Sequence, residues 1–435
     1  MTDQTIYPKF IETDPIYLDY NASTPIDKAV ADAMVPYLYH HFGNPSSNHV
    51  YGNRTKAAIN EARNQVAHLI SADPSEILFL SGGSESINMS LIGGALHLRD
   101  QGKTIIASCF EHPAVNETLD YLHKEYNFNI IKLNVDIHGF LNVSELVSSL
   151  SPDVVLVTCM LANNELGSIQ PIQEICSVVK NYAREHNIEI LMHTDASQAM
   201  GKIDVNAHEL GVDYLTLAAH KFYGPKGVGC SYIRNGSLKP LVLIHGASQE
   251  MGLRAGTENV ILDVGIGKAA ELVKSDIHEK IQQYYTLRNK LRELLIAGSP
   301  VYTRVNSVED PSKCLPNTLS ISFKGIPASC IIAHIKDKVA TSAGAACHSA
   351  GDEFSLSPVL EAAHIPVMYA LGTLRLSVGR YTTEDDIEKA AKYILEAISS
   401  LIQDPIPAMI RVWTKLNINK DMLLKNGRDT DEDEH

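Results

Sequence analysis

Three polar motifs follow apolar runs of the sequence and carry side chains that can bind a phosphorylated aldehyde. Gly83 and Ser84 follow the run EILFL and can present backbone N–H groups and a hydroxyl to a phosphate at the start of a helix. Asp195 follows IEILMHT, and a carboxylate buried at a strand end needs a cationic partner. Lys221 follows YLTLAAH, where burial would lower the pKa of the amine toward use in a Schiff base.

Each of these motifs also has an ordinary explanation when it is taken alone. A Gly-Ser pair can simply cap a helix, Asp195 can cap the helix after its strand, and most lysines are solvated surface residues. Taken together, however, the three motifs favour one cofactor, pyridoxal 5'-phosphate. The protonated pyridine nitrogen of that cofactor usually pairs with an aspartate, and its aldehyde reacts with a lysine.

A single cysteine, Cys347, lies in the run AGAACHSAGDEF, whose small and acidic residues are typical of a mobile loop. We interpret it as a functional thiol, because an exposed cysteine is a liability unless its reactivity is used. His348 can help to deprotonate this thiol or can simply be solvated. The other six cysteines lie mostly in apolar runs and are predicted to be core residues.

Short apolar runs alternate with amphipathic helical stretches between residues 54 and 235. The runs cover residues 76–80, 103–108, 153–160, 188–194, 214–219 and 228–233. This rhythm predicts an α/β fold with a mostly parallel sheet that is covered by helices. Ligands of such sheets bind beyond the C-terminal ends of the strands, which is where the polar motifs lie.

The sequence predicts two domains and a tail. We expect a large cofactor-binding domain over residues 16–260, and a smaller α+β domain over 261–402 that includes 1–15 and carries the cysteine loop. A long helical region, roughly 259–297, connects the two. The polar segment 403–435, which contains Trp413 and ends in DTDEDEH, is expected to be loosely held.

The amino-acid composition of the chain limits the classes of molecule that we expect it to bind. The 435 residues include 37 basic and 51 acidic side chains, and the net charge of −14 disfavours nucleic acid as a partner. Seven cysteines without zinc-type spacing predict reduced thiols, and the 18 histidines are scattered without metal-ligand spacing. No apolar run is long enough to span a membrane, and no targeting peptide is recognised. We therefore expect a cytoplasmic protein that acts on small molecules.

With these motifs, the chain resembles the class V aminotransferase family of fold-type I pyridoxal-phosphate enzymes, which includes cysteine desulfurases and selenocysteine lyases. The likeness covers about residues 16–402. The motifs that carry it are YLDYNASTP (17–25), GNPSS (43–47), EHPAV (111–115), MLANNELG (160–167), HTDASQ, HKFYGPKG, RAGTEN (254–259), GAACHS and RLSVGR (375–380).

The resemblance implies roles for the residues around the cofactor ring. Lys221 matches the Schiff-base lysine, Asp195 the partner of the pyridinium nitrogen, and Gln198 the donor to the phenolic oxygen of the ring. His112 matches the histidine that stacks on the ring, and Asn164 the asparagine beside it, where it also contacts substrate.

The resemblance implies further roles on the phosphate and substrate sides. Phosphate-side positions are Gly83, Ser84 and His220, and in the homodimer of this family Thr257 is expected to reach the phosphate of the partner subunit. Arg375 fits the clamp for the substrate carboxylate, because a guanidinium can bind a carboxylate through two parallel hydrogen bonds. Cys347 fits the thiol that attacks the chalcogen.

The implied activity is the removal of selenium from L-selenocysteine, or of sulfur from L-cysteine, to leave L-alanine. Ala218 stands where many desulfurases have the serine of Ser-x-His-Lys, and this feature and the GAACHS loop favour a selenocysteine lyase. The alternative is a cysteine desulfurase that forms a persulfide on Cys347 and passes sulfur to an acceptor protein for iron-sulfur cluster or thiolation pathways. A catalytically inactive binding scaffold is an alternative of another class, against which the intact Lys221, Asp195 and His112 argue.

Overall fold

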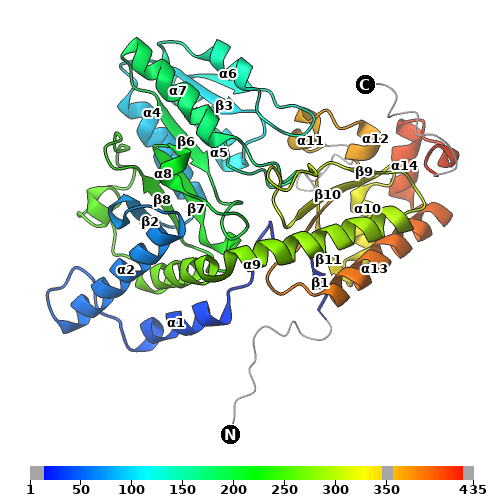
Figure 1. Cartoon of the computed structure of the whole chain (residues 1–435), viewed down its shortest axis with the longest axis horizontal. Helices are drawn as coiled ribbons and strands as arrows, with labels where there is room; N and C mark the ends of the chain where they lie inside the picture. The colour runs from blue at the N-terminus through cyan, green and yellow to red at the C-terminus, as the bar shows by residue number, and fades with distance from the viewer. Residues whose placement is uncertain (1–13, 345–355, 425–435) are drawn as a thin grey trace, which may run out of the picture.

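The computed structural model describes residues 14–344 and 356–424, and its larger part is built on a seven-stranded sheet (Figure 1). The strand order is β2-β8-β7-β6-β5-β3-β4, and all neighbours are parallel except that β8 runs antiparallel to β7 and β2. The predicted mostly parallel sheet is therefore confirmed. The strands are β2 (Ile77–Leu80), β3 (Thr104–Ser108), β4 (Asn129–Leu133), β5 (Val154–Thr158), β6 (Leu191–Asp195), β7 (Tyr214–Ala218) and β8 (Gly229–Ile233).

Helices cover both faces of this sheet because successive side chains of a strand point to opposite sides. In β2, Ile77 and Phe79 join one core cluster, whereas Leu78 and Leu80 join the other. The first cluster contains side chains of α2 (Val50–Leu69), α7 (Ile172–His186) and the early part of α9 (Val260–Gly298), and the second those of α3 (Gly83–Asn88), α4 (Gly94–His97) and α5 (Pro113–Tyr126). The remaining helices of this part are α1 (Lys28–Tyr39), α6 (Val143–Ser149) and α8 (Ala207–Leu210).

The smaller part contains a four-stranded antiparallel sheet in the order β12-β13-β10-β9. Its strands are β9 (Thr303–Val305), β10 (Thr318–Phe323), β12 (Ser342–Ala343) and β13 (Thr373–Ser377), and a separate parallel pair joins β1 (Ile16–Tyr17) to β11 (Val339–Ala340). Its helices are α10 (Ala328–Ile335), α11 (Pro358–Ala362), α12 (Val367–Ala370), α13 (Glu384–Gln403) and α14 (Pro407–Lys415).

The long helix α9 runs through both parts of the molecule (Figure 1). Its buried apolar side chains between Ile266 and Ile277 lie in the core of the larger part, whereas those between Tyr284 and Leu295 lie in the core of the smaller part. The domain limits expected from the sequence, residues 16–260 and 261–402, remain a prediction. Within the described residues, no helix combines the length and the apolar character needed to cross a membrane.

The segment after residue 403 differs from the loosely held tail that the sequence suggested. Helix α14 buries Met409 and Val412, which are three residues apart and therefore lie on one helix face. The indole nitrogen of Trp413 donates a hydrogen bond to the backbone oxygen of Gly325 at 2.7 Å. That expectation was wrong up to residue 424, because an apolar stripe within the polar segment packs on the smaller part.

Candidate active site

Three of the predicted site residues lie beyond the C-terminal ends of the parallel strands. Asp195 is the last residue of β6 and is 8% exposed, and its Oδ1 accepts a hydrogen bond from the backbone N–H of Ser197 at 2.9 Å. Lys221 follows β7, and His112 follows β3 as the N-cap of α5. The charges of Asp195 and Lys221 both act on the pKa of His112, so these groups share one site.

The Lys221 amine is half-buried and is held by backbone oxygens. Its Nζ donates to the carbonyl oxygens of Asn21 at 2.9 Å and of Ala22 at 3.0 Å. Burial, followed by the charge of Arg375, lowers the pKa of Lys221 to about 8, against the opposing effect of Asp195 and Asp19. A larger fraction of this amine is therefore unprotonated near neutral pH than of a solvated lysine.

The His112 imidazole is held in a defined orientation. Its Nδ1 accepts a hydrogen bond from the backbone N–H of Ala114 at 3.1 Å, which closes the first turn of α5. Burial lowers the pKa of His112, and the nearby Asp195 opposes that shift while Lys221 adds to it. The ring is therefore neutral at pH 7, with its proton on Nε2, and is suited to packing against an aromatic cofactor.

The sequence drew no attention to Glu111, which braces this side of the site. Its Oε1 accepts hydrogen bonds from the Ser108 hydroxyl and, at 2.7 Å, from the backbone N–H of Met160, so it joins the ends of β3 and β5. Burial raises the pKa of Glu111 to about 7, and the charge of Asp195 adds to this. The signal available in the sequence was its place in the motif EHPAV, directly before His112.

The predicted phosphate-side residues are placed at the start of α3 and after β7. A Cβ built on Gly83 would lie 3.4 Å from the Cβ of Ala218 and 3.5 Å from the hydroxyl oxygen of Ser197. Ser197 is therefore a candidate to supply the hydroxyl that Ala218 lacks. Burial and nearby lysines, chiefly Lys221, lower the pKa of His220 to about 4. Ser84 at the start of α3 is exposed.

The segment RAGTEN lies beside the same helix start. The guanidinium of Arg254 pairs with Glu85 of α3, with 3.0 Å between its Nε and the carboxylate Oε1. Thr257 is exposed, and among residues 14–344 and 356–424 no hydrogen bond or ion pair joins it to the other site residues of this chain. Its predicted role at the phosphate of a partner subunit remains a prediction.

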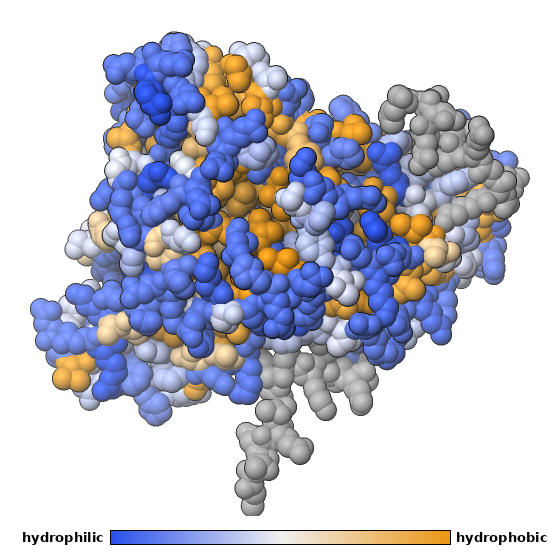
Figure 2. Space-filling model, in the orientation of Figure 1, coloured by the Kyte–Doolittle hydropathy of each residue, from blue (hydrophilic) through white to orange (hydrophobic). Residues whose placement is uncertain are grey.

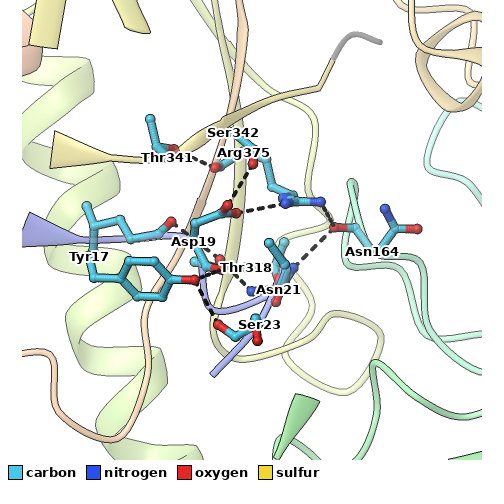
Figure 3. A network of polar contacts seen from close by, with 12 residues as sticks. Tyr17, Asp19, Asn21, Ser23, Asn164, Thr318, Thr341, Ser342 and Arg375 are labelled. Carbon is cyan, nitrogen blue, oxygen red and sulfur yellow. Dashed lines mark hydrogen bonds and ion pairs between the residues drawn. The ribbon is translucent and has the colours of Figure 1, made fainter. Parts of the chain in front are cut away.

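A polar network surrounds Arg375 on the substrate side (Figure 3). The guanidinium Nη2 lies 2.8 Å from Oδ1 of Asp19, whose Oδ2 accepts a hydrogen bond from the hydroxyl of Ser342 at 2.9 Å. Nη1 donates to the backbone oxygen of Asn164 at 3.4 Å, and that oxygen also accepts from the side chain of Asn21 at 3.2 Å. Asp19 orients the guanidinium, a role that the sequence did not indicate although Asp19 lies in the motif YLDYNASTP.

The Arg375 guanidinium retains binding capacity beyond these contacts. Its Nε is buried and has no hydrogen-bond partner within the described structure. The side chain has five N–H groups, and its hydrogen bonds to Asp19 and Asn164 use two of them, so a carboxylate can still be bound through two N–H groups. Arg375 and Asn164 thus lie together, and their roles in substrate binding remain a prediction.

Cys347 and His348 lie outside the described residues. The residues on either side of that segment contact the site, because Ser342 donates to Asp19 and the hydroxyl of Ser357 donates to Oε2 of Glu165 at 2.6 Å. Burial raises the pKa of Glu165 to about 7, although Ser357 and Arg375 oppose that shift. Of the other six cysteines, Cys109 is half-buried and the remaining five are buried, as predicted for core residues.

The residues present fit pyridoxal phosphate. A lysine amine with a lowered pKa, a buried aspartate and a neutral imidazole converge at the strand ends, and a glycine-rich turn opens a helix beside them. The orphaned Nε of Arg375 adds a donor for an anionic amino-acid group. This set matches a cofactor that has an aldehyde, a basic ring nitrogen and a phosphate.

Comparison with known proteins gives a consistent result. Residues 16–390 match the family model described as aminotransferase class-V. A protein named cysteine desulfurase IscS from Dictyoglomus turgidum is 44% identical over 392 residues, which cover 89% of this chain and 94% of that relative. A protein of the same name from Clostridium botulinum is 39% identical over 93% of this chain and 98% of the relative.

Solved structures show the same fold. A structure titled NifS-like protein aligns with a TM-score of 0.81 and 35% sequence identity, and covers 89% of this chain and 100% of that chain. A second, titled SspA in complex with cysteine, aligns with a TM-score of 0.71 and 32% identity, and covers 84% of this chain and 99% of that chain.

Proposed function

The chain belongs to the aminotransferase class-V family, and we propose that it is a pyridoxal-phosphate-dependent cysteine desulfurase that converts L-cysteine to L-alanine. The observation that carries the proposal is the Lys221 amine, whose pKa is lowered to about 8 at the end of β7. The charges of Asp195 and Arg375 both act on the pKa of this amine. The relatives named cysteine desulfurase support the choice of substrate.

The site residues divide between holding the cofactor and binding substrate. Lys221 would carry the cofactor covalently, Asp195 would hold a proton on its ring nitrogen, and His112 would pack on the ring. The phosphate would lie at the start of α3, against Gly83 and the hydroxyl of Ser197. When bound, pyridoxal phosphate supplies an electron sink for the bond-breaking steps at the substrate Cα and Cβ.

The protein side chains would then bind cysteine and move its protons. The free N–H groups of Arg375 bind the substrate carboxylate, and Asp19 keeps the guanidinium in place. The Lys221 amine, once released, accepts the Cα proton and returns a proton to the product. Because its pKa is about 8, both forms of this amine are present near neutral pH. The neutral form can accept the Cα proton, and the protonated form can donate a proton to the product.

Cys347 would accept the sulfur. Its thiolate attacks the sulfur of the substrate, a new S–S bond forms, and the electron pair of the broken C–S bond goes to Cβ, which then takes up a proton. Cysteine and the enzyme thiol thus become alanine and an enzyme persulfide, and no external oxidant or reductant is needed. An acceptor protein or thiol would remove this sulfur in a later step.

Selenocysteine is the second candidate substrate. The Ala218 position and the GAACHS sequence favour it, whereas the names of the relatives favour cysteine. An inactive scaffold is disfavoured, because it would have no need of an amine with a lowered pKa beside a buried carboxylate.

We also propose a homodimer as the active unit. Large apolar side chains are exposed on α1, on the α1–α2 connection, at the start of α2 and on the segment after β8, which Figure 1 places at the end of the molecule away from the smaller part. They include Val35, Leu38, Tyr39, Phe42, Val50, Tyr51, Leu243, Ile244 and Met251. In Figure 2, orange atoms lie at the lower left, where Figure 1 places the α1–α2 connection. Exposed apolar surface of this kind indicates an interface.

The reduced thiols of the six described cysteines favour the cytoplasm as the location of the protein.

The direct test is a side-by-side assay of alanine production from L-cysteine and L-selenocysteine with the cofactor-loaded protein. We expect alanine from cysteine and no product from Lys221→Ala, which should also lack the visible absorbance of the bound cofactor. Alanine from selenocysteine alone would make the protein a selenocysteine lyase. No alanine from either substrate would refute the proposed function.

A further inference from the structure

A second lysine, Lys202, is buried beside the candidate active site and has no role in the reaction described above. It is 4% exposed, and no carboxylate pairs with it among the described residues. Burial, followed by the charges of Lys221 and Arg375, lowers the pKa of Lys202 well below its ordinary value. The neutral form of this amine is therefore favoured more than in a solvated lysine, and the amine can donate a hydrogen bond in either form.

The Lys202 amine makes one hydrogen bond within the described part of the chain. Its Nζ donates to Oε1 of Gln198 at 2.7 Å, and Nε2 of Gln198 in turn donates to the backbone oxygen of Asn21 at 2.9 Å. That same oxygen accepts from Nζ of Lys221, also at 2.9 Å. The buried Lys202 amine and the half-buried Lys221 amine are therefore connected through one glutamine side chain and one carbonyl.

These contacts fix which way the Gln198 amide faces. The oxygen of a side-chain amide is an acceptor and its nitrogen carries two N–H groups, so the two ends are not interchangeable. The Gln198 oxygen accepts from Lys202, and one N–H group of the amide donates to the Asn21 carbonyl. The second N–H group of Gln198 therefore remains available to a ligand. Without Lys202, Oε1 would be a buried acceptor with no partner, and the amide would lose one of its two anchors.

We propose that Lys202 is a positioning residue that holds the Gln198 amide with an N–H group directed at the phenolic oxygen of pyridoxal phosphate. The identity of this oxygen rests on the proposed function, but the contact between Lys202 and Gln198 does not. Lys202 acts through Gln198 and touches neither cofactor nor substrate.

The first test is a pH titration of the visible absorbance of the cofactor-loaded protein. Lys202→Met removes the donor at nearly constant length, and Gln198→Ala removes the amide. Both variants should move the titration midpoint in the same direction, by about half a pH unit or more, because one hydrogen bond to the cofactor is lost. The double variant should show no further shift.

The matched control is Lys324→Met in the smaller part of the molecule. Lys324 is 3% exposed and lies near the rings of Tyr302 and Tyr369, so this variant also removes a buried lysine. Its midpoint should equal that of the wild type. A wild-type midpoint in Lys202→Met, or separate additive shifts for Lys202→Met and Gln198→Ala, would overturn the proposal.

The second test uses the protein without cofactor. In a cycle of Lys202→Met, Gln198→Ala and the double variant, the changes in Tm should depart from additivity by about 2 °C or more, because the two side chains contact each other. Additive changes in Tm would refute the contact itself. A wild type that never develops the visible band would instead refute the proposed function, and this cycle would still decide whether Lys202 holds Gln198.

Discussion

The Lys221 amine should capture pyridoxal phosphate well below the pH at which an ordinary lysine reacts. Only the unprotonated amine attacks the aldehyde, and the pKa of Lys221 is lowered to about 8 from 10.5, chiefly by burial and next by Arg375. At pH 7 this leaves about 9% of the amine unprotonated, against about 0.03% for a solvated lysine. The reactive fraction is therefore larger by a factor on the order of 300.

The same electrostatic reasoning predicts the effect of one substitution. Arg375→Met removes a cation that lowers the pKa of Lys221 and leaves Asp19, which acts in the opposite direction, without its partner. A single charge beside a partly buried group is worth roughly 1–2 kcal/mol. The pKa of Lys221 should thus rise by about 0.7–1.5 units.

The assay is stopped-flow mixing of cofactor-free protein with pyridoxal phosphate over a range of pH. The capture rate of the wild type should rise with pH and level off above about pH 8, and the midpoint for Arg375→Met should lie higher. Arg292→Met is the control, because Arg292 pairs with Glu309 and is not among the charges that act on Lys221. A wild-type midpoint near that of a solvated lysine, or an unchanged midpoint in Arg375→Met, would refute the reasoning.

Three further predictions concern stability, turnover and assembly. The pKa of Glu111 is raised to about 7 in the folded protein, so the folded state holds a proton that the unfolded state releases, and stability falls as pH rises from the ordinary glutamate value toward 7. Between pH 5 and pH 8 the wild type should lose on the order of 2.5 kcal/mol from this group, and Glu111→Gln should avoid that loss in urea unfolding; equal losses in both proteins would contradict the assignment. Asp195→Asn should retain the bound cofactor but turn over cysteine far more slowly, because the ring nitrogen loses the group that keeps it protonated; near wild-type activity would mean that another residue holds this nitrogen. Phe42→Asp, at a side chain that is 74% exposed, should convert the dimer to a monomer in sedimentation experiments, whereas Tyr121→Asp, at a 44% exposed side chain on α5, should not; a dimer that persists in Phe42→Asp would place the interface elsewhere.

The sheet could be predicted from the sequence because its central strands are short and rich in apolar residues. β5, β6 and β7 are buried on both faces, and each of their runs VVLVT, LMHTD and YLTLA is only five residues long. β4 was missed for the opposite reason. It lies at the edge of the sheet, and only the last residue of Asn129–Leu133 is fully buried.

The candidate site residues could also be selected from the sequence, because each follows a strand directly or lies in a recognisable motif, and their roles remain predictions. The supporting contacts could not be predicted in this way, because they join residues that are far apart in the sequence. Asp19 and Arg375 are separated by 356 positions, and Asn21 and Lys221 by 200. A pattern read along the chain says which side chains are able to bond but not which of them the fold brings together.

The central claim is that Cys347 takes sulfur from cysteine in a reaction that depends on Lys221. It is tested most directly by mixing the cofactor-loaded protein with one equivalent of L-cysteine, without an acceptor thiol, and measuring alanine together with the mass of the peptide that contains Cys347. We predict one alanine per subunit and a mass gain of one sulfur atom on that peptide, and neither product in Lys221→Ala. Alanine formed without the mass gain at Cys347, or formed equally by Lys221→Ala, would contradict the account.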